Sequence, residues 1–383
     1  MARKAYIGVD NIARKIKKGY IGVDGIARRI KKAYIGVGGV ARPCWGSGVL
    51  TRYGNIEKLG VDRTNLAGAS VGNYALFAGG NTNRTASGYY SGQFSNVLDA
   101  YDTSLTHTEP ASLLGKARDQ LVGVSLLGKY AFFAGGGYYD TSTKYYEDSN
   151  QVDVYDTSLT RVSSIQPLPT PRMSVQATHV GDYALFAGGF SSGETEVTAY
   201  NSSLIQTVCA EMPDGKRNHA AASVGDYALV AGGATSNNSV TNVVYAYDKS
   251  LTRSIPVALS SARYQLAGAS TYDHALFAGG YASSRSNVID VYDKSLTRTN
   301  HISLTYSVSD PIAVTVQGFV IFADGSGASK LVQAFDNSLT KILPEVLTDG
   351  KDYGGGAAAS VGDYALFAGG DNVNDQVEAY VVA

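Results

Sequence analysis

The chain has 383 residues, of which 44% are hydrophobic, and its 44 glycines and 27 tyrosines stand against a single tryptophan. This composition excludes a disordered chain and favours a turn-rich β protein over a helical one. The formal net charge of −1 is unevenly spread, because residues 1–45 carry eleven Lys or Arg against two Asp, whereas the rest carries 21 basic and 31 acidic residues. Cys44 and Cys209 are too few for a disulfide framework or a metal knuckle, so we expect free thiols and a buried Cys209.

Residues 1–47 contain a short tandem repeat. The segments KAYIGVDNIARKIK, KGYIGVDGIARRIK and KAYIGVGGVARPCW begin at Lys4, Lys18 and Lys32, a period of 14 residues. Each has Asp-Asn, Asp-Gly or Gly-Gly at its centre, flanked by β-branched residues, and this pattern predicts a β-hairpin. A short basic helix over IARKIKK is the alternative. We expect residues 1–47 to form a basic stem or anchor of β-repeats.

The remaining residues, 48–383, are built from a longer repeat. The sequence YALFAGG and its variants end in Gly-Gly pairs that start at Gly79, Gly135, Gly188, Gly232, Gly279 and Gly369, with a degenerate copy at Asp324-Gly325. Each unit reads as two strands joined by a Gly-Asp type turn, a variable loop, a third strand that ends in Tyr-Asp, a tight turn and a fourth strand. Four short strands in a unit of about 45 residues, in seven copies, are typical of a β-propeller.

The segment VLTRYGNIEKL at Val49–Leu59 resembles the fourth strands of later units, although no unit precedes it. Those strands carry an SLTR motif, as in SLTRVSSIQPL from Ser158, SLTRSIPVAL from Ser250 and SLTRTNHISL from Ser295. The last unit, in turn, stops at QVEAYVVA, after its third strand. A ring of sheets with a missing strand would expose an unpaired edge. We therefore predict that residues 48–59 pair with the C-terminal blade and close a seven-bladed ring.

The Asp of the repeated YD(T/K)SL turn can accept hydrogen bonds from the backbone two residues further on. A structural role is therefore predicted for Asp102, Asp156, Asp248 and Asp293.

Three features resemble the kelch repeat over roughly residues 48–383, namely the Gly-Gly pair, the Tyr near the end of the third strand and an Arg that opens the first strand. These arginines are Arg63, Arg118, Arg172, Arg217 and Arg263. The chain departs from the kelch pattern because SLTR replaces the fourth-strand Trp, and the Arg is absent from the last two units. The resemblance implies an all-β, seven-bladed kelch-like β-propeller behind a short β-repeat stem.

Two roles are open for the five arginines. They can form hydrogen bonds between blades, or they can line the channel mouth and bind an acidic ligand, as in some kelch proteins. A guanidinium suits a carboxylate or phosphate, so the ligand in the second case would be an anionic glycan or a teichoic-acid-like polymer.

The variable loops of the first two units are rich in aromatic residues and lie on the face opposite the stem. We predict a carbohydrate site there, because a tyrosine offers a flat apolar face for a sugar ring and a hydroxyl for hydrogen bonding. Its candidate residues are Tyr89, Tyr90, Phe94, Tyr138, Tyr139, Tyr145, Tyr146, Arg84 and Asp140. The alternative is that these aromatic residues pack the two loops against each other.

Catalytic motifs are missing from the sequence, which has no Walker loop, zinc-ligand spacing or nucleophile elbow. A copper-radical oxidase needs clustered His and Tyr ligands, but the histidines lie at different positions of their units. They are His107, His179, His219, His274 and His301. Sialidase-like Asp boxes end in Trp, and Trp45 precedes the ring. We expect no enzyme, no metal and no cofactor.

The 14-residue repeats resemble short N-terminal repeats of prophage-encoded tail and fibre proteins over about 45 residues. The start MARKAYIGVD has no apolar leader, and no run approaches a membrane span. We therefore expect no membrane insertion, and a phage or prophage virion protein made in the bacterial cytoplasm. Its head would bind a host glycan or anionic polymer, and residues 1–47 would contact other virion proteins, with a homotrimer favoured. A capsid or tail decoration protein and an intracellular kelch-type interaction scaffold are the alternatives.

Overall fold

The computed structural model describes residues 5–9, 12–16, 20–23, 26–29, 33–37, 40–45, 49–82, 93–190, 194–323, 325, 331–342, 354–370 and 375–382. Throughout these ranges the chain forms strands, turns and loops but no helix. A search of the same residues finds no helix that could cross a membrane.

The first three blades follow each other along the chain as separate antiparallel sheets. Blade one contains β8 (Ala67–Val71), β9 (Tyr74–Ala78), β10 (Leu98–Asp102) and β11 (His107–Thr108). Blade two contains β12 (Val122–Leu126), β13 (Tyr130–Ala134) and β16 (Val152–Tyr155), and a two-stranded hairpin of β14 (Gly137–Asp140) and β15 (Tyr145–Asp148) is inserted before β16. Blade three contains β17 (Gln176–Val180), β18 (Tyr183–Ala187), β19 (Val197–Asn201) and β20 (Gln206–Val208).

The next three blades repeat this four-stranded order. Blade four contains β21 (Ala220–Val224), β22 (Tyr227–Ala231), β23 (Val244–Asp248) and β24 (Arg253–Ser254). Blade five contains β25 (Ala267–Ser270), β26 (His274–Ala278), β27 (Ser286–Asp293) and β28 (Arg298–Val308). Blade six contains β29 (Ile312–Val316), β30 (Phe319–Ala323), β31 (Val332–Phe335) and β32 (Lys341–Ile342).

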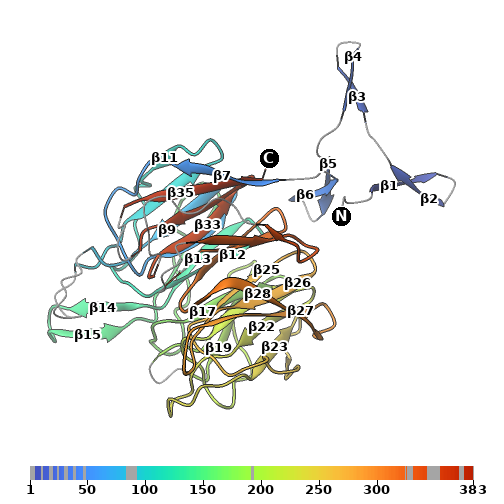
Figure 1. The fold of residues 1–383 in the computed structure, drawn as a ribbon. Coiled ribbons are helices and arrows are strands. Elements are labelled where there is room, and N and C mark those ends of the chain that lie inside the picture. The colour runs from blue at the N-terminus through green and yellow to red at the C-terminus, as the bar shows by residue number, and fades with distance from the viewer. Residues whose placement is uncertain are drawn as a thin grey trace.

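Blade seven combines the two ends of the ring. It contains β33 (Ala357–Val361), β34 (Tyr364–Ala368), β35 (Val377–Val382) and, as its fourth strand, β7 (Leu50–Asn55). Figure 1 shows the blue β7 beside the red β35, and the pairing runs from Leu50 opposite Val382 to Asn55 opposite Glu378. The pairing predicted from the orphan segment is confirmed. The chain is a seven-bladed β-propeller.

The Gly-Gly pairs join neighbouring blades. Gly79 has a φ of +68°, and a Cβ there would lie 2.7 Å from the carbonyl oxygen of Arg118 in blade two. The N–H of Gly80 donates to that same carbonyl at 2.9 Å. Equivalent bonds run from Gly136 to Arg172 and from Gly233 to Arg263. The glycines are therefore required where the second strand of one blade meets the first strand of the next.

The two faces of the ring differ in their connections. One face, here called the turn face, carries the short turns between first and second strands and between third and fourth strands. Asp102, for example, accepts from the N–H groups of Ser104 and Thr106 at 2.8 and 2.9 Å. Asp156, Asp248 and Asp293 accept in the same way, as predicted. The other face, the loop face, carries the variable loops and the β14–β15 hairpin.

The N-terminal segment reaches the ring at the turn face. Leu50 is paired with Val382, and the N–H of Val382 donates to the carbonyl of Asp363 at 2.9 Å. Asp363 belongs to the turn between β33 and β34. The repeats that precede β7 are thus connected to the face opposite the variable loops.

The N-terminal repeats form β-hairpins, as the turn sequences predict, and not helices. Their strands pair as β1 with β2, β3 with β4 and β5 with β6. The bounds are β1 (Ala5–Val9), β2 (Ile12–Ile16), β3 (Tyr20–Val23), β4 (Ile26–Arg29), β5 (Ala33–Val37) and β6 (Val40–Trp45).

The core lies between the blades. Each YALFA strand is buried on both faces because its sheet is packed between two others; in blade one, Phe77 and Leu76 are both fully buried. Phe77 packs edge-on against Tyr101 of β10, with ring centroids 6.0 Å apart. Cys209 is a buried free thiol, as expected, and burial raises its pKa to about 11.

Candidate functional site

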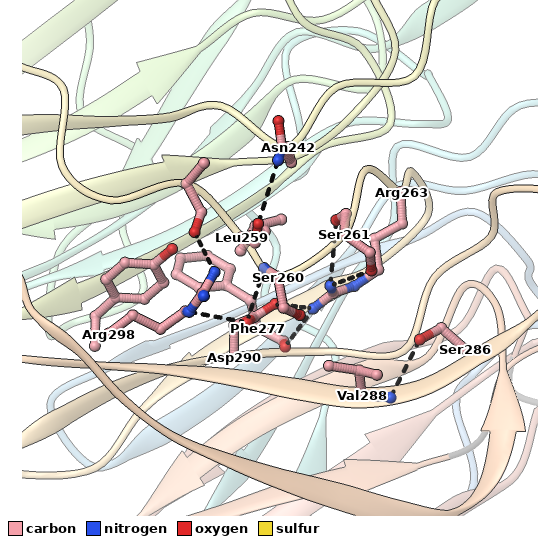
Figure 2. A network of polar contacts seen from close by, with 12 residues as sticks. Asn242, Leu259, Ser260, Ser261, Arg263, Phe277, Ser286, Val288, Asp290 and Arg298 are labelled. Atoms are coloured by element: carbon pink, nitrogen blue, oxygen red, sulfur yellow. Dashed lines mark hydrogen bonds and ion pairs between the residues drawn. The ribbon is translucent and has the colours of Figure 1, made fainter.

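In blades two and five, a buried ion cluster joins the arginine that precedes the first strand to the arginine of the SLTR motif. In blade five, the guanidinium of Arg263 lies 2.8 Å from Asp290 Oδ2, and Arg298 Nε lies 3.7 Å from Asp290 Oδ1 (Figure 2). Arg263 also donates to the carbonyl of Phe277 at 3.1 Å, and the N–H of Ser260 donates to Asp290 at 3.0 Å. The third-strand acid is therefore held between a cation that precedes the first strand and a cation of the fourth.

Besides blade five, four other blades carry all or part of this cluster. The clusters are Arg63, Asp99 and His107 in blade one, Arg118, Asp153 and Arg161 in blade two, Arg172 and Glu196 in blade three, and Glu378 and Arg52 in blade seven. Burial lowers the pKa of Arg63 to about 10 and also lowers the pKa of Arg118 and Arg172. The side-chain contacts of these arginines serve the scaffold.

The arginines predicted to bind an acidic ligand are therefore not available at the channel mouth. Arg63, Arg118, Arg172 and Arg263 are 0–1% exposed and each is paired with an acidic side chain. None of them lines the cavity described below. The other predicted role, side-chain hydrogen bonding between blades, is not what the described contacts show either. The four guanidinium groups bond within their own blades, and the bonds from the preceding blade go to the backbone carbonyls of the arginines.

The prediction that Arg217 opens the first strand of blade four, as the other four arginines do in their blades, is wrong. The buried cation of blade four is Lys216, which is 0% exposed and donates to the carbonyl of Gly232 at 3.1 Å. Burial lowers the pKa of Lys216 to about 8, with Asp214 3.8 Å away as a partly compensating charge. Arg217 lies one residue later, and its guanidinium lies 5.0 Å from the ring centroid of Phe190.

A cavity of about 600 Å³ opens at the centre of the ring, and one residue of each blade surrounds it with a left-handed backbone. These mouth residues are Asn65, Gln120, Ser174, Asn218, Gln265, Asp310 and Gly355, with φ between +50° and +69°. The N–H of Gln120 donates to the carbonyl of Asn65 at 2.9 Å, and that of Gln265 donates to Asn218 at 2.7 Å. The left-handed conformation thus lets the mouth residues of neighbouring blades bond to each other.

The inner strands of neighbouring blades lie close together along the wall of the cavity. A Cβ on Gly123 would lie 2.2 Å from the carbonyl oxygen of Gly68, and a Cβ on Gly268 would lie 2.4 Å from that of Ala221. The inner strands therefore approach each other too closely for larger side chains. Hydroxyl groups at the next level join the blades, since Ser70 Oγ donates to the carbonyl of Ser360 at 2.6 Å.

The cavity offers hydrogen-bonding groups but little acid–base chemistry. Asp310 and His219 are its two lining residues, among those described, with carboxylate or imidazole groups. His219 is 2% exposed, its Nε2 lies 3.1 Å from the carbonyl oxygen of Ala187, and burial lowers its pKa to about 3. A neutral, fixed imidazole and one carboxylate suit ligand binding better than proton transfer.

The predicted aromatic site is divided by the β14–β15 hairpin. Tyr139 is paired with Tyr146, whereas Tyr138 is paired with Glu147, so alternate tyrosines point to opposite faces of the hairpin. Tyr145 pairs with Asp140 on the same face as Tyr138 and is 70% exposed.

Hydrogen bonds of the Tyr146 hydroxyl connect the β14–β15 hairpin to residues at the channel mouth. Its hydroxyl donates to Asp119 at 2.7 Å, and Gln120 Nε2 donates to the same hydroxyl at 3.3 Å. The ring of Phe94 lies 5.7 Å from that of Tyr146, so these two side chains from neighbouring blades do meet. Burial raises the pKa of Asp119 to about 6. Tyr146 therefore packs the two loops against each other, which is the alternative role given above. Arg84, Tyr89 and Tyr90 lie outside the described residues.

Among the residues that the structure describes, one group of side chains has a composition that could hold a metal ion. Ligand atoms of Asp99, His107 and Glu109 lie within 4.8 Å of one another. The carboxylate of Asp99 is, however, paired with the buried guanidinium of Arg63, which would repel a cation. This geometry favours an ion-pair cluster over a metal centre.

Comparison with known proteins gives the fold and no family. No protein-family model matches the chain. A search of curated proteins also finds no match. Among solved structures, one described as "Structure of YjhT" is similar with a TM-score of 0.57 and 13% identity, over 76% of this chain and 99% of that one.

Proposed function

We propose that this protein is the receptor-binding component of a phage or prophage virion, and that it binds a host-cell glycan at the mouth of its channel without catalysing a reaction. The observation that carries this proposal is the 600 Å³ cavity with its rim of amide, hydroxyl and carboxylate side chains. Amide groups both donate and accept hydrogen bonds, as sugar hydroxyls do. A cavity of this size accommodates one or two sugar rings.

The connection of the N-terminal segment supports a head-and-stem arrangement. The chain enters blade seven at the turn face, whereas the variable loops and the β14–β15 hairpin lie on the loop face. A particle-anchored stem of residues 1–47 would thus leave the loop face directed away from the particle. The resemblance of the 14-residue repeats to those of tail and fibre proteins, and the kelch-like repeats of the ring, agree with this assignment.

The nature of the partner follows from charge. Four of the arginines that could have bound an anionic polymer are buried and neutralised by acids. Because these four arginines cannot contact an anionic polymer, we favour a glycan over a teichoic-acid-like polymer as the ligand.

The test is a glycan array probed with the labelled full-length protein, together with adsorption of that protein to candidate host cells. The proposal expects binding to a restricted set of glycans, competed by the free sugar. Absence of binding to every carbohydrate and every cell type would refute carbohydrate recognition. Labelling of purified particles with an antibody against the protein tests the virion assignment separately.

A further inference from the structure

Arg217 differs from the other four arginines of the predicted acidic-ligand site. Its side chain is half-buried, and its guanidinium forms no ion pair or hydrogen bond with any residue that the structure describes. The buried cation of blade four is Lys216, which lies near Asp214 and donates to the carbonyl of Gly232. The N–H donors of Arg217 are therefore open to a ligand.

The other arginines of the ring have partners within the protein. In the part of the ring that the structure describes, each arginine except Arg217 and Arg285 contacts an acidic side chain or a backbone carbonyl. These are Arg52, Arg63, Arg118, Arg161, Arg172, Arg253, Arg263 and Arg298. Arg285 is exposed and behaves as an ordinary solvated side chain, whereas Arg217 is held by an aromatic ring.

Phe190 holds the guanidinium of Arg217 on the loop face, where blade three meets blade four. Cζ of Arg217 lies 5.0 Å from the ring centroid of Phe190. Phe190 is 42% exposed, so this Phe190–Arg217 pair is open to solvent. A guanidinium that lies over an aromatic ring still presents parallel N–H groups, which match the two oxygens of a carboxylate.

The backbones of both residues are fixed. The N–H of Phe190 donates to the carbonyl of Met173 at 2.8 Å. Arg217 and Ala234 exchange two backbone hydrogen bonds, each of 2.9 Å. Binding of a ligand therefore orders side chains alone, which lowers its entropic cost.

The Phe190–Arg217 pair lies directly outside the rim of the central cavity. Arg217 precedes the mouth residue Asn218, and Phe190 is paired through its backbone with Met173, which precedes the mouth residue Ser174. Neither Arg217 nor Phe190 lines the cavity itself. A glycan bound in the cavity can therefore extend onto the pair.

The charge of the surroundings limits the ligand to a single negative group. Residues 46–383 carry 21 basic and 31 acidic residues, so the ring repels a polyanion or a doubly charged group. Arg217 is the one cation among the residues that directly precede the mouth residues. They are Thr64, Asp119, Met173, Arg217, Tyr264, Ser309 and Gly354. One guanidinium can pair with one carboxylate here.

We infer that Arg217 and Phe190 form a subsite for one carboxylated sugar, a uronate, of the bound glycan. Arg217 donates to both carboxylate oxygens, and the exposed part of the Phe190 ring contacts the apolar face of the sugar. This inference rests on the proposed function and adds to the cavity a second subsite that recognises an acidic ring of the same glycan.

The chain offers a matched control. Arg217→Gln removes the guanidinium of the subsite. Arg285→Gln removes the same charge from the loop face of the next blade, at a residue that does not line the cavity. Neither guanidinium bonds to a described residue, so both variants should keep the wild-type melting temperature. Phe190→Ala tests the contact with the sugar ring.

The experiment is calorimetric titration of the full-length protein with uronate oligosaccharides from pectin, alginate, hyaluronan and heparosan, each as the free acid and as the neutral methyl ester, and with inorganic phosphate. At least one free acid should bind about tenfold or more tightly than its ester, because the acid alone pairs with the guanidinium. Inorganic phosphate should bind more weakly than that acid.

The variants locate this preference for the acid. Arg217→Gln should bind the acid as weakly as the ester and should bind the ester as the wild type does. Arg285→Gln should keep the wild-type ratio of the two affinities. Phe190→Ala should weaken acid and ester to a similar degree.

Several results would overturn the inference. Equal wild-type affinity for every acid and its ester, no binding of any acid, or tighter binding of phosphate would contradict a carboxylate subsite, while neutral glycans bound on the array would leave the proposed function intact. A wild-type ratio in Arg217→Gln, or an equal loss in Arg285→Gln, would show that the subsite is not at Arg217. No binding of any sugar here or on the array would overturn the proposed function, and this inference with it.

Discussion

Removal of residues 1–60 tests how strongly the two ends of the chain hold the ring together. This deletion takes away β7 with Leu50 and Leu59, whose side chains are 3% and 4% exposed. It also removes Arg52, which is paired with the fully buried carboxylate of Glu378. Deletion of residues 1–47 removes the hairpin repeats alone and leaves β7 in place.

These contacts set the loss in the free energy of unfolding that the 1–60 deletion causes. Burial of one leucine contributes about 1.5–3 kcal/mol, so loss of both costs about 3–6 kcal/mol. A buried carboxylate that loses its cation costs about 3–5 kcal/mol more. The total of about 6–11 kcal/mol is comparable with the whole free energy of unfolding of a typical domain, about 5–15 kcal/mol. We therefore expect the shorter variant to be largely unfolded or to lose blade seven.

Urea unfolding followed by circular dichroism measures the difference between the two deletions. The 1–47 deletion should unfold at the midpoint of the full-length ring, and the 1–60 deletion at a much lower one. Adding Glu378→Gln to the 1–60 deletion should recover about 3 kcal/mol, because it removes the uncompensated charge. Equal midpoints for the two deletions would refute the closure of the ring by β7.

Further predictions concern charge, packing and assembly. Burial raises the pKa of Asp119 to about 6, above its usual 3.8, so the folded state binds this proton more tightly and the free energy of unfolding falls by on the order of 3 kcal/mol as pH rises from about 4 to about 6. Asp119→Asn should abolish that decline in urea titrations against pH, and an unchanged pH profile would contradict it. Asp290→Ala leaves a buried guanidinium without its carboxylate and should cost about 3–5 kcal/mol, against about 1 kcal/mol for the more exposed Arg298→Ala; similar losses in the two variants would count against the ion cluster. Gly123→Ala places a Cβ 2.2 Å from a carbonyl oxygen of blade one and should cost about 1–3 kcal/mol by thermal unfolding, a wild-type melting temperature being the contrary result. Light scattering should find the full-length chain oligomeric, with a trimer favoured, and the variant without residues 1–47 monomeric, since isolated hairpins need partners; a monomer in both cases would remove the stem.

The repeating sequence predicted the ring because its signals are local. YALFAGG identifies a buried strand and the glycines that end it, and SLTR identifies the fourth strand even where it stands alone at Val49–Leu59. The position of Arg217 was harder to assign, because Lys216 and Arg217 are adjacent cations and residue type does not distinguish them. The equivalent cation is the one that lies two positions before the left-handed mouth residue. Lys216 precedes Asn218 by two positions, as Arg263 precedes Gln265.

The mouth residues were missed for a physical reason. Asn and Asp tolerate the left-handed region, but Gln120, Ser174 and Gln265 have no such preference, and their conformation is imposed by hydrogen bonds to the neighbouring blade. The signal that could have found them is a polar residue two positions after each first-strand cation. The separation of Tyr138 from Tyr139 was equally hidden, because a loop that folds into a hairpin divides its side chains between two faces.

The pairing of β7 with β35 also sets the order of events during synthesis. Arg52 and Glu378 are separated by 326 positions, so at about 5–20 residues per second the ribosome needs about 15–65 s to make the second after the first. Over that interval β7, the first strand of the ring to be synthesised, has no partner strand, and it is the last strand of the ring to pair. A chain released early by premature termination keeps an open ring with exposed strand edges, which proteases and chaperones recognise. The ring therefore cannot close until β35 has been synthesised, more than 300 residues after its partner strand.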